Sequence, residues 1–211
     1  MLTADGLAPE DEQRREAKRR LVAETRRLVE AVALVDGAAT SNAEVEALTA
    51  RVAAATAEIE SAPSLREPGL FSSKGFSSHL AERSPISGQS NPLAAPLEMW
   101  LDGDVTRARA TYGPAYEGPP GCLHGGVVAG AFDELLGVAQ MASGSAGFTG
   151  TLIVRMRRPT PLGRTIEYEG GVDRVDGRKI HAWGRSTCDG ELLAEAEGIF
   201  ISGANGRPPY A

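Results

Sequence analysis

The sequence predicts an α+β protein in which one antiparallel sheet wraps around a single apolar helix, with a pair of helices ahead of it. Three observations support this prediction. The run from residue 125 to residue 139 has almost no polar face, which is typical of a helix enclosed on nearly all sides. From residue 97 onward, short segments alternate apolar and polar residues and are separated by turn residues. Residues 1–62 instead repeat apolar residues at helical spacing.

The N-terminal region, residues 1–62, is expected to form a hairpin of two amphipathic helices. Asp36-Gly37 ends the first helix, and Ser41 with Glu44 forms a capping-box pattern for the second. The two apolar stripes consist of Leu21, Leu28, Val32 and Val35, and of Val45, Leu48, Val52, Ala55 and Ile59. We expect the hairpin to pack on its own domain or on a partner subunit.

The next segment, residues 63–96, is rich in Pro, Ser and Gly and is expected to be a linker or a surface arm rather than a packed element. Phe71 and Phe76 could pin this arm to the body. The body itself is expected to span residues 97–203, and residues 204–211 form a C-terminal tail.

Within the body, the pattern predicts two strands, the apolar helix and four more strands. The strands are expected at residues 97–101, 105–112, 149–158, 165–175, 178–188 and 191–202. Gly170-Gly171 predicts a bulge in the fourth strand. The helix follows Gly118-Pro119-Pro120-Gly121, a turn that cannot be helical because its prolines lack an N–H.

Composition argues against several classes of function. The formal net charge of −6 disfavours a nucleic-acid-binding face, and the basic cluster in residues 1–62 is outnumbered, 8 Lys and Arg against 12 Asp and Glu. No apolar stretch approaches the ~20 residues of a membrane span, and the first residues do not resemble a secretory signal. Cys122 and Cys188 are far apart and the histidines are scattered, so we expect no metal site and a cytoplasmic protein.

Three features together resemble the hotdog-fold acyl-CoA thioesterases. They are the run His124-Gly125-Gly126, the carboxylate of Asp133 nine positions after the histidine, and the strand Thr149-x-x-Leu152 that ends in Arg157-Arg158-Pro159. The most similar subgroups are the phenylacetate-degradation (PaaI) type and the thioesterase-superfamily-member (THEM) type, and the similarity covers roughly residues 95–203. The resemblance implies a hotdog fold and a side-by-side homodimer that often pairs into a dimer of dimers, a homotetramer.

The resemblance also implies roles for individual residues. Asp133 would act as the nucleophile or as the general base on water, and the N–H of Gly125 would polarise the thioester carbonyl. Thr149 would assist the carboxylate or its water. No metal or redox cofactor is implied, because coenzyme A enters as part of the acyl-CoA substrate.

Other residues near the motif carry open alternatives. Gly126 would let an acyl chain approach the backbone, since it has no Cβ. His124 either fixes the turn through backbone hydrogen bonds or takes a direct part in the reaction. Arg157 and Arg158 either bind the phosphates of coenzyme A or form a solvated strand end. Thr151 competes with Thr149 on the same expected face.

Further side chains are assigned by their position alone. Glu134 lies ~100° around the helix from Asp133 and is expected to be structural or interfacial. Phe132, Trp183 and Phe200 are candidates for the border of an acyl tunnel. The alternative function is a non-catalytic protein that binds or senses acyl-CoA. A hydratase or dehydratase is less favoured, because the segment that would carry its Asp/His pair is missing.

The spacing of Gly125 and Asp133 supports a separate inference. Eight residues of helix span about 12 Å, too far for both groups to contact one reacting carbon at ~3 Å. We therefore expect each site to combine Gly125 of one chain with Asp133 of a two-fold-related chain.

Overall fold

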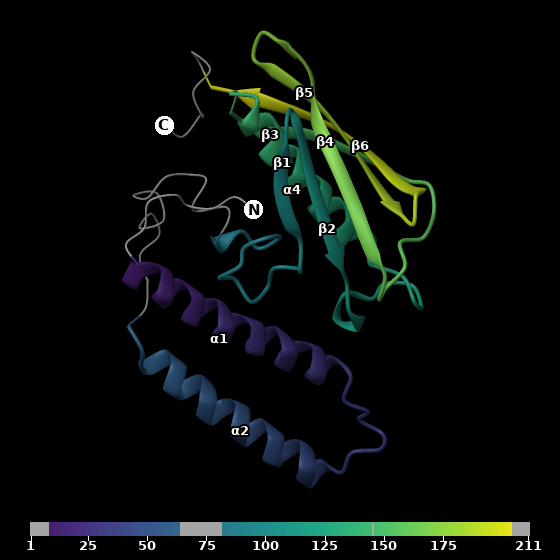
Figure 1. Ribbon diagram of the computed structural model, residues 1–211. Helices are drawn as coiled ribbons and strands as arrows, with labels where there is room; N and C mark the ends of the chain where they lie inside the picture. The colour runs from purple at the N-terminus through teal and green to yellow at the C-terminus, as the bar shows by residue number, and fades with distance from the viewer. Residues whose placement is uncertain (1–8, 64–81, 145, 204–211) are drawn as a thin grey trace.

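The computed structural model describes residues 9–63, 82–144 and 146–203 (Figure 1). Its main elements, in chain order, are α1 (Pro9–Ala33), α2 (Asn42–Ser61), β1 (Glu98–Asp102), β2 (Val105–Thr111), the 3-10 turn η2 (Pro114–Tyr116), α4 (Gly125–Ala142), β3 (Gly147–Met156), β4 (Thr165–Asp176), β5 (Lys179–Cys188) and β6 (Glu191–Ser202). The predicted order of two strands, one helix and four strands is confirmed.

The six strands form one antiparallel sheet in the order β1-β2-β4-β5-β6-β3, and the sheet curves around α4 (Figure 1). The helix α4 connects β2, near one edge of the sheet, to β3, which is the edge strand on the opposite side. This arrangement confirms the predicted α+β class and hotdog fold.

The helix α4 sits close to the sheet because glycines line the strands beneath it. A Cβ added at Gly184 of β5 would lie 3.2 Å from Leu136 and 3.2 Å from Phe132, and one at Gly198 of β6 would lie 3.0 Å from Leu136. Leu136 and Phe132 are fully buried there. Because these glycine positions have no side chains, they set how closely α4 approaches the sheet.

The irregularities of β4 and β3 differ from the prediction. The bulge expected at Gly170-Gly171 is wrong, because Gly170 pairs with Gly184 in register and the shift lies between Val172 and Arg174. Gly170 serves close packing instead, since a Cβ there would lie 3.1 Å from Leu135. A second shift, which the sequence pattern did not predict, lies between Thr149 and Thr151 in β3.

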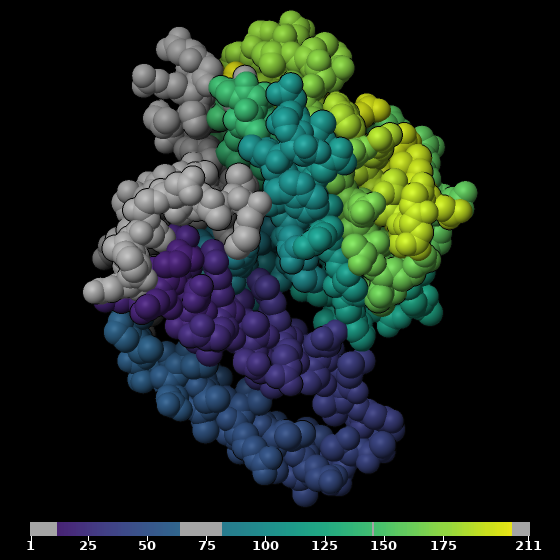
Figure 2. Space-filling model, in the orientation of Figure 1, coloured from purple at the N-terminus to yellow at the C-terminus, as the bar shows by residue number. Residues whose placement is uncertain are grey.

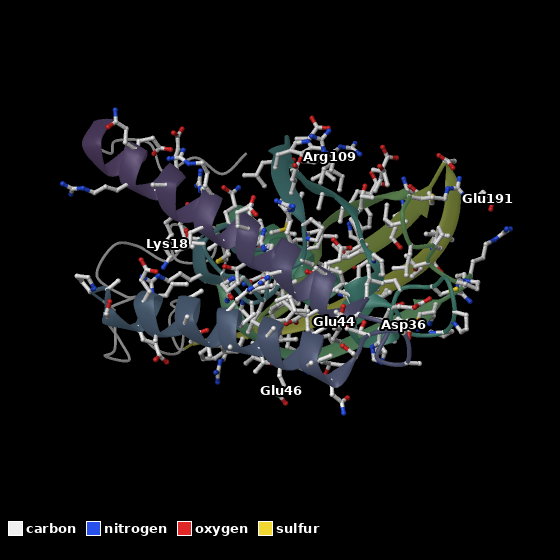
Figure 3. All side chains as sticks on the ribbon, turned by 90° about the horizontal axis from the view of Figure 1, so that it is seen from below. Lys18, Asp36, Glu44, Glu46, Arg109 and Glu191 are labelled. Carbon is white, nitrogen blue, oxygen red and sulfur yellow. The ribbon has the colours of Figure 1, made fainter. Side chains whose placement is uncertain are left out.

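The two N-terminal helices form the predicted hairpin, with α2 on the far side of α1 from the sheet (Figures 1 and 2). The capping box of Ser41 and Glu44 is present, and Asp36 and Glu44 lie at the same end of the hairpin (Figure 3). No residue of α2 is buried, so its apolar stripe faces solvent in the single chain.

Residues 82–97, here called the packed segment, lie between α1 and the body. Ala94 is fully buried and Leu97 is 6% exposed, so this part of the predicted arm is packed and not a free surface linker. Ile86 lies against α4, since its Cδ1 would be 3.0 Å from a Cβ added at Gly130. Phe71 and Phe76 lie outside the described residues.

The described residues hold neither a membrane span nor a metal cluster. No helix there has both the length and the apolar character needed to cross a bilayer. In the same part of the chain, no group of three or more His, Cys, Asp and Glu side chains is placed to hold a metal ion.

Leu136→Ala is expected to lower the free energy of unfolding by about 2–5 kcal/mol, because it leaves a cavity between α4 and the sheet. Leu101→Ala, at a side chain that is 45% exposed, serves as the control and should cost less than about 0.5 kcal/mol. Urea denaturation measures both values. Equal costs for the two variants would contradict this account of the core.

Candidate active site

The loop before α4 positions His124 at the start of the helix. Gly121 has a φ of +72°, a backbone conformation that favours glycine, and the amide of Cys122 donates to the carbonyl of Pro119 at 2.8 Å. Gly118 packs against His124, where a Cβ would lie 2.8 Å from the His124 Cα. The backbone N–H of His124 then donates to the carbonyl of Tyr116 at 2.9 Å.

His124 is the N-cap of α4, and its Nδ1 accepts the N–H of Gly126 at 3.0 Å. This hydrogen bond corresponds to the turn-fixing alternative for His124. Because Nδ1 is the acceptor, the neutral ring carries its proton on Nε2, which leaves one N–H donor facing outward. The side chain is exposed, so that donor is accessible.

The amide of Gly125 is the first of the helix α4 and is left without an acceptor among the described residues. An unbonded N–H at a helix N-terminus carries a positive partial charge. Gly125 therefore offers a donor to a negatively charged or polarised oxygen. The N–H of Gly126 is already used by His124.

Asp133 and Thr149 are brought together although they belong to different elements. The Thr149 hydroxyl donates to Oδ1 of Asp133 at 2.9 Å, from β3 to the middle of α4. Thr149 pairs with Phe200 of β6, and Thr151 pairs with Ile199, the residue before Phe200. Because adjacent residues of a strand face opposite sides, the two threonines also face opposite sides of the sheet. The extra residue between them is Gly150, and the expectation that Thr151 shares the face of Thr149 is therefore wrong.

Glu134 turns away from Asp133 and accepts a hydrogen bond from the Ser87 hydroxyl of the packed segment. That contact agrees with the structural role expected for it. The carboxylate of Asp133 keeps one oxygen, Oδ2, for which no hydrogen bond is found among the described residues. A half-buried carboxylate with one oriented oxygen and one available oxygen can accept a proton or attack an electrophile.

The arginines at the end of β3 are paired with glutamates of β6. Arg157 donates to Glu195 at 2.8 Å and Arg158 donates to Glu191 at 3.0 Å, and both guanidinium groups remain more than half exposed. Glu191 stands at the outer end of the sheet in Figure 3. The pairs lie beyond the C-terminal end of β3, whereas Asp133 contacts the other end of this strand at Thr149.

A cavity of about 200 Å³ lies beside the N-terminus of α4. The body contributes one wall, formed by Tyr112, Tyr116, His124, Gly126, Val127 and Ala131. Burial raises the pKa of Tyr112 to about 12 and also raises the pKa of Tyr116. Both phenols are therefore neutral near pH 7, and the two tyrosines bring no charge to the cavity wall.

The aromatic residues expected at an acyl tunnel lie elsewhere. Phe132 and Phe200 are buried in the core between α4 and the sheet and do not line this cavity. Trp183 alternates with the buried residues Ala182 and Gly184 on β5, so its side chain is on the outer face of the sheet. Trp183 therefore does not line this cavity, and its place at a tunnel border stays a prediction.

Comparisons with known proteins give a consistent set of relatives. No family model matches the sequence. A solved structure described as a thioesterase superfamily protein is 34% identical, with a TM-score of 0.73, over 87% of this chain and 94% of that one. Residues 97–203 are only about half of the chain, so that match also extends into the region before the body, beyond the part that the sequence motifs cover.

Two curated relatives are acyl-coenzyme A thioesterases named THEM4. The protein from Xenopus laevis is 35% identical over 91 residues, which are 42% of this chain and 41% of the relative. The protein from Bos taurus is 36% identical over 91 residues, 42% of this chain and 37% of the relative. The match thus spans about two fifths of the length of these curated relatives.

The His124 cap can be tested by its effect on stability. His124→Ala should lower the free energy of unfolding by about 1 kcal/mol, because the Gly126 N–H loses its acceptor, and His124→Asn should recover most of the loss. Chemical denaturation of the three proteins measures the difference. A His124→Ala protein as stable as the parent would contradict the capping role.

Proposed function

The chain belongs to the thioesterase superfamily, and from this premise we propose that it hydrolyses acyl-CoA thioesters to a free acid and coenzyme A. We place the reaction at a site shared by two copies of the chain. The observation that carries the proposal is the hydrogen bond between Thr149 and Asp133, which orients a half-buried carboxylate on α4.

Asp133 supplies the attack in this proposal. With Oδ1 held by Thr149, Oδ2 either takes a proton from water as the water oxygen bonds to the thioester carbon, or bonds to that carbon itself. In the first route the C–S bond then breaks and the acid is released. In the second route an acyl anhydride forms as the thiolate leaves, and water hydrolyses it. A thiol has a pKa of about 8.5, so the departing thiolate needs little help from a general acid.

The carbonyl oxygen gains negative charge in both routes and needs donors that are already in place. The unbonded N–H of Gly125 is the first donor in this proposal. His124 adds the second, through Nε2–H, since its Nδ1 is committed to Gly126. Gly126 has no Cβ on the cavity side, which leaves room for the acyl group.

Two features support a site shared by two copies of the chain: the rigidity of α4 and the exposed edge strand β3. Gly125 and Asp133 lie on one continuous helix, about 12 Å apart, so one chain cannot bring both to a single carbonyl carbon. β3 is an unpaired edge that carries Phe148, Ile153 and Met156 at 42–53% exposure. A two-fold pairing of β3 with its copy would cover these side chains and extend the sheet.

Arg157 and Arg158 are proposed to bind the phosphates of coenzyme A. Their guanidinium groups are exposed and can donate to an oxyanion while retaining one glutamate contact. The phosphates would compete with Glu195 and Glu191, and this contribution is therefore smaller than that of an unpaired arginine.

Asp133→Asn is expected to lower kcat by about 10²- to 10⁴-fold, because the amide can neither take the proton nor attack. Thiol release from acyl-CoA, followed with a colorimetric thiol reagent, measures the rate. Asp104→Asn, in the exposed turn between β1 and β2, is the matched control and should keep the parent rate. Acyl-CoA binding without thiol release by the parent protein would favour the alternative, a non-catalytic acyl-CoA-binding protein.

The threonines give an internal comparison within the same assay. Thr149→Val should lower kcat by about 10- to 100-fold, the value of one hydrogen bond to a charged group. Thr149→Ser should keep most of the activity, and Thr151→Val, on the opposite face, should have little effect. Equal losses for Thr149→Val and Thr151→Val would argue against the oriented carboxylate.

Mixing two inactive variants tests the shared site. Gly125→Pro removes the N–H at the first helical position, where proline is tolerated, although the flexible end of Met156 must move. When the Gly125→Pro and Asp133→Asn proteins are mixed in equal amounts and exchange subunits, half of the dimers are heterodimers, and each heterodimer has one complete site. About one quarter of the parent activity should then return. If each chain used its own Gly125 and Asp133, no activity would return on mixing.

A further inference from the structure

The cavity beside α4 has a second wall that the body does not supply. Pro85, Ile86, Leu93, Ala95 and Leu97 of the packed segment line it opposite the helix. Leu93 is 75% exposed at the rim, and His124 and Gly126 are exposed on the α4 side. The cavity therefore opens next to the proposed carbonyl site, and the packed segment forms the wall opposite α4.

The packed segment is held by α4 at one end and by the turn η2 at the other. Ile86 fits against Gly130, where a side chain would collide with it, and Ser87 donates to Glu134 on the same helix. At the far end, the Tyr116 hydroxyl donates to the carbonyl of Ala94 at 3.3 Å. The wall is thus attached to the element that carries the proposed catalytic carboxylate.

The helix α1 clamps this segment from outside. Nη2 of Arg26 donates to the carbonyls of Gly88 at 2.8 Å and Asn91 at 2.7 Å. Arg19 and Arg15 pair with Glu82 at the start of the segment, and the Glu82 carboxylate also accepts from Ser90. Burial lowers the pKa of Arg26, which reflects how far α1 and the segment enclose this guanidinium.

We propose that the packed segment, clamped by α1, is the end wall of the acyl pocket and restricts the protein to compact apolar acyl groups. This inference rests on the proposed thioesterase function. Ile86, Leu93 and Ala95 are the specificity-determining residues, and Arg26 is a positioning residue that acts through the segment. A thioester carbonyl at the Gly125 amide would direct its acyl group past Gly126 into the cavity.

The volume sets the size of the acyl group. An apolar protein cavity of about 150 Å³ holds one benzene, or about 25 Å³ per carbon. On that scale, the cavity of about 200 Å³ accepts about eight carbons, as a short chain or a single aromatic ring. A longer chain would have to displace the packed segment from α4.

The test measures kcat/KM for butanoyl-, octanoyl-, dodecanoyl- and hexadecanoyl-CoA with the full chain. The parent should lose at least about tenfold between octanoyl- and dodecanoyl-CoA. The ratio of kcat/KM for octanoyl-CoA to kcat/KM for dodecanoyl-CoA should fall by about threefold or more in two variants. Ile86→Ala lengthens the cavity, and Arg26→Ala detaches the packed segment from α1. Ala95→Leu should fill the cavity and lower the octanoyl rate relative to the butanoyl rate. Ile59→Ala and Arg27→Ala, at exposed positions of α2 and α1, are the matched controls.

Binding of alkyl-CoA thioethers of the same lengths, measured by calorimetry, separates this inference from the proposed reaction. Thioethers cannot be hydrolysed, so the same length limit in binding supports the wall even for a protein that releases no thiol. A parent that accepts the hexadecanoyl group as well as the octanoyl group would overturn the inference. So would a length profile that Ile86→Ala, Ala95→Leu and Arg26→Ala all leave unchanged.

Discussion

The close contact between α4 and the sheet is the constraint on which the other features depend. Leu136 and Phe132 are buried against the glycine positions of β5 and β6, where any side chain on the strand would push the helix outward. Because the inner flank of α4 is fixed at this depth, its opposite flank and its N-terminus are fixed as well. The positions of Asp133, Gly125 and the His124 cap relative to the strands follow from that single packing arrangement.

A rigid helix assigns its two chemical groups to different places. The amide of Gly125 at the start of α4 has no acceptor in the described part of the chain, while Asp133 lies two turns further along with its own hydroxyl partner. No side-chain rotation can shorten a distance set by the helix backbone. The edge strand β3, which supplies Thr149, is also where the sheet can be continued, so the carboxylate lies near the surface that a second copy would cover.

Sequence periodicity was sufficient for the elements and their order, because hairpin turns and a helix without a polar face are local signals. The match over most of the chain to a thioesterase superfamily structure confirms the family that His124-Gly125-Gly126 and Asp133 indicated.

The facing of Thr149 and Thr151 was not predictable, because one inserted residue, Gly150, reverses the alternation and the pattern contains no sign of it. Gly170-Gly171 predicted a bulge because a strand uses glycine both where it bends and where another element packs closely, and the sequence is the same in the two cases. The packed segment was missed because its order comes from α1, more than sixty residues away, and not from its own Pro- and Ser-rich composition.

The grip of α1 on the packed segment has an evolutionary consequence. Arg26 binds main-chain oxygens of Gly88 and Asn91, which every amino acid possesses, whereas the cavity is bordered by side chains of the same segment. Mutations at Leu93, which lines the cavity but makes none of these main-chain contacts, can therefore diversify ligand preference among descendants of this chain while Arg26 keeps the segment in place. Natural selection can in this way change a side chain at the cavity and conserve the attachment of the backbone beside it.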